Sequence, residues 1–274
     1  MAKVQSGEIR VGIGGWDYDP WRGTFYPPGL PRTRQLEYAS RQLTAIEINA
    51  TFYKLQTPAL FERWGKMVPA GFKFALKGSR FCVNRRELAE AGESVARFCA
   101  QGITALGDKL GPINWQMTAT KRFEPDDFAA FLKLLPKSQD GVALRHAIEP
   151  RHESFRDPAF VAMARKAEVG IVFADDDDIP GVADASADFR YARLRRCREG
   201  EPTGYPSGEL DGLSRTALAW SNGEQDGLPG WPPLLAKPQP PKARDTFLFF
   251  IAGAKVRAPA AALALIARLG EAKA

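Results

Sequence analysis

Short apolar runs recur along the chain and are bounded by chain-breaking residues. Each run is four to eight residues long and rich in β-branched or aromatic residues, a pattern that predicts a strand. The runs are IRVGIG from Ile9, AIEIN from Ala45, FKFALK from Phe72, PINWQM from Pro112, VALRHAIE from Val142, GIVFAD from Gly170, FRYARLR from Phe189 and TFLFFI from Thr246. The sequence therefore predicts eight strands.

Between most of these runs, apolar residues recur with the period of a helix. In one such segment Leu36, Ala39 and Leu43 are spaced by three and four. Two other segments begin with residues that favour a helix start. One begins at Pro58, and the other has Asp157 as a cap before Pro158. The predicted helices are RTRQLEYASRQL from Arg32, PALFERWGKMV from Pro58, PDDFAAFLKLL from Pro125, DPAFVAMARKA from Asp157 and PAAALALIARL from Pro259.

Alternation of strand and helix predicts one α/β domain over residues 1–274 with a parallel sheet. Eight strands allow this sheet to close into a TIM-like (β/α)8 parallel barrel, for which about 250 residues are typical. The crossover between the sixth and seventh strands is irregular, because only a Pro/Gly/Asp-rich loop separates them. A Pro-rich stretch over residues 224–244 predicts an excursion across the surface. The alternative is an open doubly wound sheet, but GIGGWDY lacks the GxGxxG turn that would favour it.

Polar residues recur near the carboxyl ends of the predicted strands, where barrel enzymes place their catalytic groups. Late residues of six different strands are Glu47, Lys77, Gln116, Glu149, Asp175 and Arg193. The alternation of a strand puts further side chains on the same faces: Asn49 beside Glu47, Asn114 beside Gln116, Arg145 and Ala147 beside Glu149, and Tyr191 beside Arg193. These side chains form either a pocket of paired charges for acid–base work or a buried ion-pair network that fixes the barrel register.

The segment AIEPRHESF, from Ala147, is the densest in residues capable of chemistry. It carries Glu149, Arg151 and His152 at the end of the fifth strand and in the loop that follows. His152 is a candidate proton carrier in this loop. His146 lies within the strand itself, so we expect it to be a hydrogen-bonded packing residue.

Acidic residues suggest a divalent metal without specifying one. The run ADDDD from Ala174 has the oxygen ligands that Mg²⁺ prefers, although such a run is also typical of a solvated turn. A donor set of Glu47, Glu149, His152 and Asp175 is conceivable, but their spacing carries no diagnostic signature. No Walker loop or dinucleotide fingerprint is present, so the sequence identifies no cofactor.

The segment GWDYDPWRGTFYPPGL, from Gly15, is a long loop rich in aromatic residues. Its side chains form either one wall of a cleft or a loop held in place by its own aromatic packing. Arg22 is the interleaved cation, which is too little to indicate base stacking on a single strand of nucleic acid.

Composition adds a preference for anionic partners. The net charge of +6 and the pI of about 9.3 favour phosphorylated metabolites, nucleic acid or acidic lipid, although no block of consecutive Lys or Arg is present. Three cysteines without a CxxC pair favour a reducing compartment. Without a signal-peptide core or an apolar run of about 18 residues, we expect a cytoplasmic protein that does not contact membranes. Nothing in the sequence indicates an oligomeric state.

Six segments together resemble the YecE-type family, domain of unknown function seventy-two. They are GIGGWDYDPWRGTFYPPGLP, IEINATFYKL, RWGKMVPAGFKFALKGSR, LGDKLGPINWQM, EPRHESF and FFIAGAKVRAP, in order along nearly the whole chain. The resemblance implies a barrel of eight parallel strands and no established substrate. It places the family's polar positions on Glu47, Asn49, Tyr53, Lys77, Gln116, Glu149, Arg151, His152, Asp175 and Arg193.

The chain also departs from the family pattern. WQMTA stands where relatives read FQLPP, EPRH where they read EFRH, and Phe155 where a Trp is common. Arg195 and Arg196 follow the seventh strand where relatives often have a histidine, and FFIAGAKVRAP replaces an Asn-rich ending. These departures predict a more cationic pocket in this chain.

The leading hypothesis is an enzyme that acts on a small anionic, phosphorylated or carboxylated, substrate. Lys77, Arg151 and Arg193 would hold the anion together with Asn49, Tyr53 and Gln116, and Glu47, Glu149, His152 and Asp175 would supply acid–base groups. Hydrolase, isomerase and lyase chemistry all fit this pocket. The alternatives are a protein that binds or processes nucleic acid and a non-catalytic barrel that binds a ligand.

Overall fold

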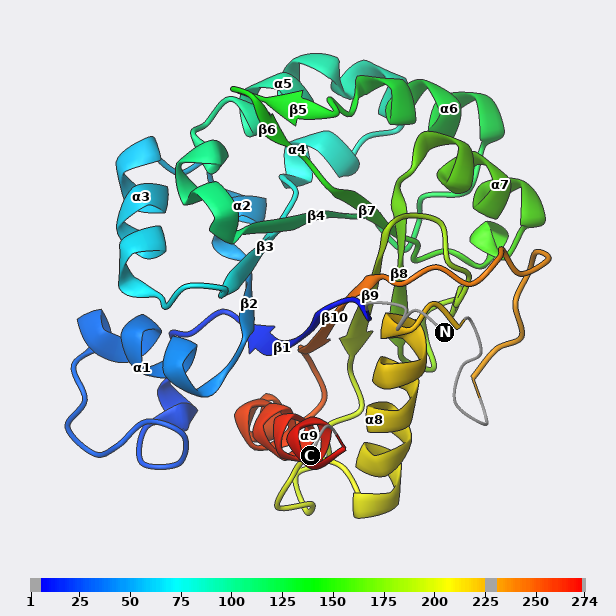
Figure 1. Ribbon diagram of the computed structural model, residues 1–274. Coiled ribbons are helices and arrows are strands. Elements are labelled where there is room, and N and C mark those ends of the chain that lie inside the picture. The colour runs from blue at the N-terminus through cyan, green and yellow to red at the C-terminus, as the bar shows by residue number, and fades with distance from the viewer. Residues whose placement is uncertain (1–5, 225–230, 273–274) are drawn as a thin grey trace.

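The computed structural model describes residues 6–224 and 231–272. Within these ranges eight parallel strands form a closed barrel in the order β1-β10-β9-β8-β7-β4-β3-β2, and Figure 1 shows helices arranged around its outside. The barrel strands are β1 (Ile9–Gly14), β2 (Ala45–Ile48), β3 (Lys73–Lys77), β4 (Leu110–Gln116), β7 (His146–Glu149), β8 (Gly170–Asp175), β9 (Phe189–Leu194) and β10 (Asp245–Phe250). The predicted TIM-like barrel is confirmed, and the open doubly wound sheet is excluded.

The five predicted helical segments are all helical. The helices are α1 (Gln35–Gln42), α2 (Ala50–Tyr53), α3 (Pro58–Met67), α4 (Arg80–Val83), α5 (Gly92–Cys99), α6 (Pro125–Leu134), α7 (Pro158–Ala167), α8 (Ser207–Ser221) and α9 (Ala258–Glu271). Short 3-10 turns lie at Asp19–Trp21, Arg32–Arg34, Leu88–Ala91, Ile103–Lys109, Glu153–Phe155 and Lys255–Arg257. The Asp157 carboxylate accepts a hydrogen bond from the Ala159 N–H at 2.7 Å, as expected of the cap of α7. No helix in the described ranges is long and apolar enough to cross a membrane.

The fifth predicted strand, VALRHAIE, is divided in two. Its first part is β6 (Val142–Ala143), which pairs antiparallel with β5 (Ser138–Gln139) in a small hairpin outside the barrel. The turn between them holds Asp140 and Gly141 at positive φ, as a tight two-residue hairpin requires. The barrel strand β7 begins only at His146.

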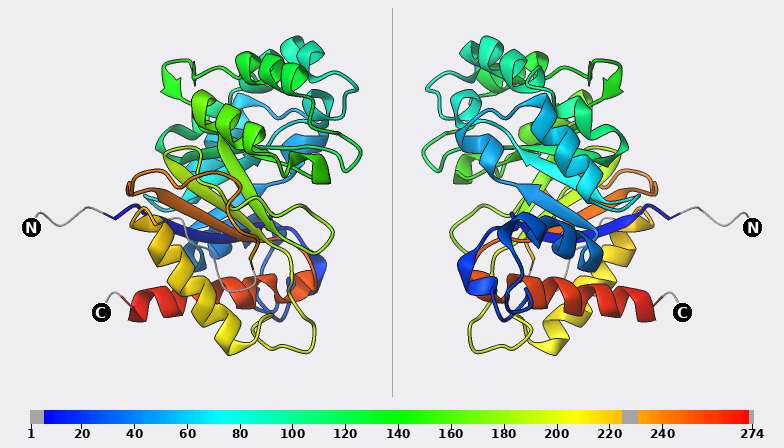
Figure 2. Two further views of the ribbon diagram at one scale, coloured as in Figure 1. Left: turned by 90° about the vertical axis from the view of Figure 1, so that its right-hand side faces the viewer. Right: turned by 90° about the vertical axis from the view of Figure 1, so that its left-hand side faces the viewer.

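The irregular crossover is confirmed, because no helix lies between β8 and β9. The segment 231–244 covers this gap instead. Trp231 stacks on Phe173 of β8 with ring centroids 3.9 Å apart, and the Asp184 carboxylate accepts hydrogen bonds from the backbone N–H groups of Leu235 and Ala236. The predicted excursion is thus a strap over the outer side of β8, while residues 225–230 lie outside the described residues. Beside this strap, α8 and α9 pack against each other and over β1 and β10, where the barrel closes (Figure 2).

The barrel interior is built in layers that follow the alternation of the strands. The apolar part of the interior consists of small residues and aromatic rings, among them Ala45, Ala75, Ala147, Val172, Tyr191, Phe247 and Phe249. Two residues further along four of these strands, toward their carboxyl ends, stand Glu47, Lys77, Glu149 and Arg193. The same alternation that fills the barrel therefore places charged side chains directly above its apolar layer.

Candidate functional site

Arg193 of β9 is the centre of the polar layer. Its guanidinium donates to Glu47 of β2 at 2.9 Å and to Glu149 of β7 at 2.8 Å. All three side chains are almost completely withdrawn from solvent. A cation thus bridges two carboxylates that come from different sides of the barrel.

Neutral and cationic side chains make the remaining hydrogen bonds to these carboxylates. The Tyr191 hydroxyl donates to Glu47, and the Asn114 amide donates to Glu149 at 2.9 Å. Arg151 donates to Glu149 through Nε at 2.8 Å and Nη2 at 2.6 Å. The Gln116 oxygen accepts from both guanidiniums, at 2.9 Å from Arg193 and 3.0 Å from Arg151. We call the eight residues Glu47, Lys77, Asn114, Gln116, Glu149, Arg151, Tyr191 and Arg193 the strand-end cluster.

The charges in the strand-end cluster fix most of its protonation states. Burial raises the pKa of Glu149, but Arg193 and Arg151 outweigh burial and hold this pKa at about 2. Burial lowers the pKa of Arg193, and the two carboxylates more than reverse that effect. Burial and the neighbouring Glu47 raise the pKa of Tyr191 well above its ordinary value. Glu149 is therefore ionised near neutral pH, Arg193 is cationic, and Tyr191 is a neutral hydrogen-bond donor.

Lys77 is the exception in the strand-end cluster. Its residue is 8% exposed, and its Nζ lies 4.1 Å from the centre of the Phe52 ring. No carboxylate of the described residues lies within ion-pair distance of this Nζ. Burial and the charge of Arg193 lower the Lys77 pKa to about 8, against the opposing effect of Glu47 and Glu149. The carboxylates of Glu47 and Glu149 are paired with the guanidiniums of Arg151 and Arg193. The Lys77 ammonium has no such partner of opposite charge among the described residues.

Three predicted site residues lie outside these contacts. Asn49 is half-buried and directly precedes α2, and Tyr53 at the end of α2 is 60% exposed. The His152 ring accepts a hydrogen bond from the Ser154 N–H at 3.1 Å and so caps the short helical turn Glu153–Phe155. Asn49, Tyr53 and His152 therefore take no part in the hydrogen bonds of the strand-end cluster. The predicted site residues that the structure does bring together are Glu47, Lys77, Gln116, Glu149, Arg151 and Arg193.

Asp175 also lies apart, because it falls on the opposite face of its strand. It shares the alternation of Ile171 and Phe173, which pack outward, whereas Val172 packs in the barrel interior. Its carboxylate pairs with Arg196 at 3.0 Å. Burial raises the Asp175 pKa to about 6 despite this partner.

The acidic side chains of the described residues do not gather into a metal site. Asp176 pairs with Arg195 at 2.6 Å, and Asp177 pairs with Arg196 at 2.8 Å. In the described ranges no group of three or more His, Cys, Asp or Glu residues is placed to hold a metal ion. The conceivable donor set of Glu47, Glu149, His152 and Asp175 is not assembled, because Arg193 bridges the first two and the others lie elsewhere.

The remaining expectations concern packing residues. His146 accepts a hydrogen bond from the Trp115 indole at 3.1 Å and contacts the Pro136 carbonyl at 2.7 Å, so its predicted packing role is confirmed. The aromatic loop is held by its own contacts: Trp21 and Tyr26 are buried, and the Tyr26 hydroxyl donates to the Trp16 carbonyl. Asn114 and Tyr191 were not predicted as site residues, although their strand faces already indicated them.

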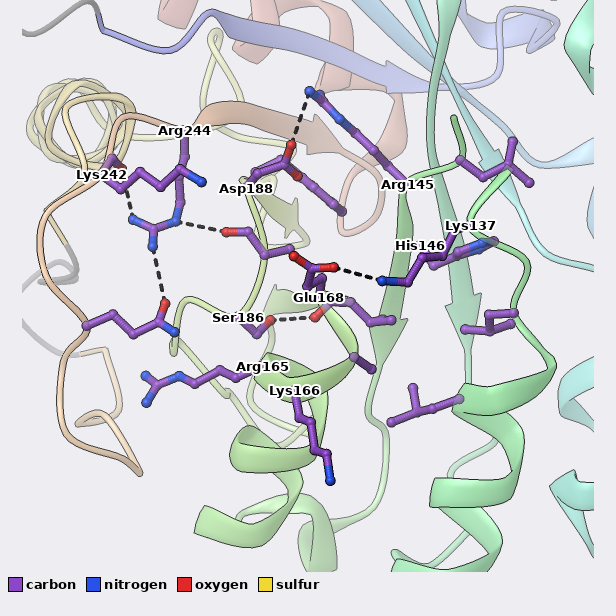
Figure 3. A pocket seen from close by; sticks show the side chains of 18 of the residues that line it. Lys137, Arg145, His146, Arg165, Lys166, Glu168, Ser186, Asp188, Lys242 and Arg244 are labelled. Atoms are coloured by element: carbon purple, nitrogen blue, oxygen red, sulfur yellow. Dashed lines mark hydrogen bonds and ion pairs between the residues drawn. The ribbon is translucent and has the colours of Figure 1, made fainter. Parts of the chain in front are cut away.

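The described residues also line a cavity of about 1080 Å³ at the opposite, amino-terminal end of the barrel strands (Figure 3). Seven Lys or Arg residues line it against two acids: Lys133, Lys137, Arg145, Arg165, Lys166, Lys242 and Arg244, with Glu168 and Asp188. Arg145 pairs there with Asp188 at 3.6 Å, and Arg244 donates to backbone carbonyls and to Gln239. Barrel chemistry belongs to the carboxyl-terminal face, so we place the candidate site at the strand-end cluster and not at this cavity.

Comparisons with known proteins agree with this architecture. A model of the DUF72 family, described as proteins of unknown function, matches residues 10–274. The UPF0759 protein YunF of Bacillus subtilis (strain 168) is 33% identical over 70 residues, which are 25% of this chain and 23% of that protein, so the match spans less than a quarter of this curated relative.

Two solved structures resemble the whole fold. A DUF72 family protein from Thermotoga maritima MSB8 has a TM-score of 0.71 at 19% identity, over 96% of this chain and 99% of that chain. Another from Enterococcus faecalis V583 has a TM-score of 0.67 at 16% identity, over 96% of this chain and 98% of that chain. At these identities the similarity shows the fold alone.

Proposed function

The chain belongs to the DUF72 family of proteins of unknown function, and from its strand-end cluster we propose that it is an enzyme acting by acid–base chemistry on a small anionic substrate. The substrate is phosphorylated or carboxylated, and it binds at the carboxyl ends of the barrel strands. The barrel alone does not support this proposal, because this fold carries many unrelated activities.

The uncompensated charge of Lys77 is the observation that carries the proposal. A purely structural ion-pair network would be expected to pair each of its buried charges, because an unpaired buried charge is costly. The two carboxylates and two guanidiniums satisfy this expectation, but the Lys77 ammonium has no carboxylate partner among the described residues. A small anion bound beside Lys77 would supply the missing charge.

Glu47 is the carboxylate to which we assign proton transfer. Glu149 accepts hydrogen bonds from both guanidiniums and from Asn114, which keeps it ionised and makes it a poor proton carrier near neutral pH. Glu47 has one guanidinium partner and the Tyr191 hydroxyl. Arg193 and Gln116 would fix the orientation of these groups rather than bind the substrate, since they are already engaged with one another.

A thermal-shift screen of the wild type and Lys77→Ala tests the proposal. The compounds are sugar phosphates, organic acids, divalent metals, and short DNA and RNA. A ligand at 100 times its dissociation constant stabilises a protein by about 2.7 kcal/mol, which corresponds to a shift of roughly 5–10 °C for a chain of this size. We expect at least one small anion to shift the wild type by this amount and to leave Lys77→Ala unshifted.

Lys66→Ala is the control, because Lys66 is an exposed lysine that pairs with Glu62 on α3. It should respond to the anion as the wild type does. The proposal fails if no phosphate or carboxylate stabilises the wild type, or if Lys77→Ala responds equally well.

We also propose a second candidate function, the binding of nucleic acid, on the basis of the amino-terminal cavity in Figure 3. Its excess of cations includes the exposed Lys133, Lys166 and Lys242, for which the described residues provide no acidic partner. Lysines in this position favour phosphate groups, and each neutralised phosphate steepens the salt dependence of binding.

Fluorescence anisotropy with short single-stranded RNA and DNA tests this second function. Simultaneous replacement of Lys133, Lys166 and Lys242 by Ala should flatten the slope of log affinity against log salt by about 2, at roughly 0.7 for each lost phosphate contact on a single strand. Lys77→Ala should leave the slope unchanged. Absence of binding, or an unchanged slope in the triple variant, would remove this candidate.

A further inference from the structure

The two buried lysines of the described chain have different surroundings. Lys121 is 9% exposed and donates to the Arg86 carbonyl at 2.6 Å and to the Asp127 carboxylate at 2.5 Å. Lys77 is equally buried, but no described residue accepts a hydrogen bond from its Nζ, which faces the ring of Phe52. Lys121 thus has two hydrogen-bond acceptors, whereas the Lys77 Nζ has none among the described residues.

Charged groups around Lys77 come from four neighbouring parts of the barrel. Arg193 of β9 and Arg151 after β7 disfavour its protonation, while Glu47 of β2 and Glu149 of β7 favour it. The net effect is a lowered Lys77 pKa, because the oxygens of the two carboxylates already accept hydrogen bonds from the guanidiniums. With a pKa of about 8, roughly one Lys77 side chain in ten carries a free amine at pH 7, against fewer than one in a thousand for an ordinary lysine.

We propose that Lys77 is a nucleophile that forms an imine with its substrate, so the substrate is a small anion that carries an aldehyde or ketone group, such as a 2-oxo acid or a ketose phosphate. This inference rests on the proposed function and narrows the substrate class of the same site. A buried lysine beside another cation is a known arrangement for activating an amine toward a carbonyl carbon.

The reaction balances with the groups at hand. The amine lone pair attacks the carbonyl carbon, a C–N bond forms, and the carbonyl π bond breaks. Counted from the ammonium, two protons leave the nitrogen and depart with the carbonyl oxygen as water, while the third stays on the iminium. The C–O bond then breaks as the C=N bond forms. Glu47 exchanges these protons with the nitrogen and the oxygen through an intervening water, because its carboxylate lies beyond ion-pair distance of Nζ. No oxidant, reductant or metal is consumed.

An iminium suits the charges of the strand-end cluster. It keeps the positive charge of Lys77, so the anionic group of the substrate still has a cation beside it. It also acidifies the carbon next to the former carbonyl, and we assign the removal of that proton to the same Glu47. Cleavage of a carbon–carbon bond or movement of a double bond would follow, which fits the lyase and isomerase classes.

Reductive trapping tests the inference on the full chain. The probes are glyoxylate, an anionic aldehyde, and formaldehyde, a neutral one, each at limiting concentration with sodium cyanoborohydride at pH 7. The modified lysines are located by mass spectrometry of peptides. We expect Lys77 to be labelled at least about tenfold faster than the exposed Lys54 and Lys66 of the same molecules, because its larger fraction of free amine outweighs its restricted access. Glyoxylate should show a larger preference for Lys77 than formaldehyde does.

Two variants serve as matched controls. Lys77→Met removes the amine and should lose the selective adduct, with its melting curve recorded to show that it is folded. Lys121→Met removes the other buried lysine and should still be labelled at Lys77. Should Lys77→Met fold poorly, the comparison of Lys77 with Lys54 within the wild type decides the question.

The outcomes separate this inference from the function on which it rests. If Lys77 is labelled no faster than the exposed lysines, while a small anion still stabilises the wild type and not Lys77→Ala, the imine is excluded and the anion site stands. If neither labelling nor stabilisation depends on Lys77, both proposals fall. Selective labelling by formaldehyde with none by glyoxylate would overturn the anionic carbonyl substrate.

Discussion

Replacing Arg193 by Met is expected to lower the free energy of unfolding at pH 7 by about 3–5 kcal/mol, the usual cost of removing one partner from a buried ion pair. Met keeps much of the side-chain volume, so the lost unfolding free energy comes from the removed charge and not from a cavity. Glu47 and Glu149 are both completely buried and both lose their shared cation. Urea unfolding measures the change, which is a large part of the 5–15 kcal/mol that holds a typical domain folded.

The comparison with Arg151→Met shows whether the bridging position matters. Arg151 also pairs with Glu149, but its side chain is 17% exposed, so water can replace part of its contact. We expect its loss to cost no more than about 1–2 kcal/mol, nearer to that of a surface pair. Similar losses in the two variants, or a loss below 1 kcal/mol for Arg193→Met, would mean that Arg193 does not hold the strand-end cluster together.

A large cost for Arg193 and a small one for Lys77 would support the division of roles proposed for these residues. Arg193 compensates charges of the protein itself, so its removal should harm folding first. Lys77 compensates no carboxylate of the described chain, so its replacement should affect ligand binding and labelling more than stability. A structural ion-pair network predicts that both substitutions mainly destabilise the protein.

The strand pattern predicted the barrel and most of the strand-end cluster for the same physical reason. A strand alternates its side chains between two faces, so finding the apolar residues at Ala45, Ala75 and Ala147 also locates Glu47, Lys77 and Glu149 two positions later. The closed order of the strands then brings these residues around one axis. Both steps need only the alternation within each strand and the regular geometry of a barrel. A single sequence contains enough information for both.

The failures have two causes, a strand alternation that was overlooked and contacts that no local pattern reveals. Asp175 was expected in the site from its position at a strand end, but it shares the outward face of its strand with Phe173. His152 was expected there from its loop, and instead its ring caps the next turn. Helix α8 was not predicted because Gly208 and Gly212 weaken its helical signal, while its buried face packs against α9, β1 and β10.

Acid should unfold this protein partly by protonating Glu149. Its pKa is about 2 in the folded protein and about 4.5 in an unfolded chain, so the ionised group stabilises the fold above pH 4.5. This contribution is lost as the pH falls from about 4.5 through about 2. The interval of about 2.5 pH units corresponds to about 3 kcal/mol of unfolding free energy.

Glu149→Gln isolates this contribution, because the amide cannot titrate and no longer offers a charge to Arg193 and Arg151. Urea unfolding at pH 7, 4 and 2.5 should show the variant well below the wild type at pH 7, with the difference shrinking as the wild type becomes protonated. Glu62→Gln is the control, since the exposed Glu62 pairs with Lys66, and its difference from the wild type should stay small throughout. A gap between the wild type and Glu149→Gln that is as wide at pH 2.5 as at pH 7 would show that Glu149 is not held ionised by its guanidinium partners.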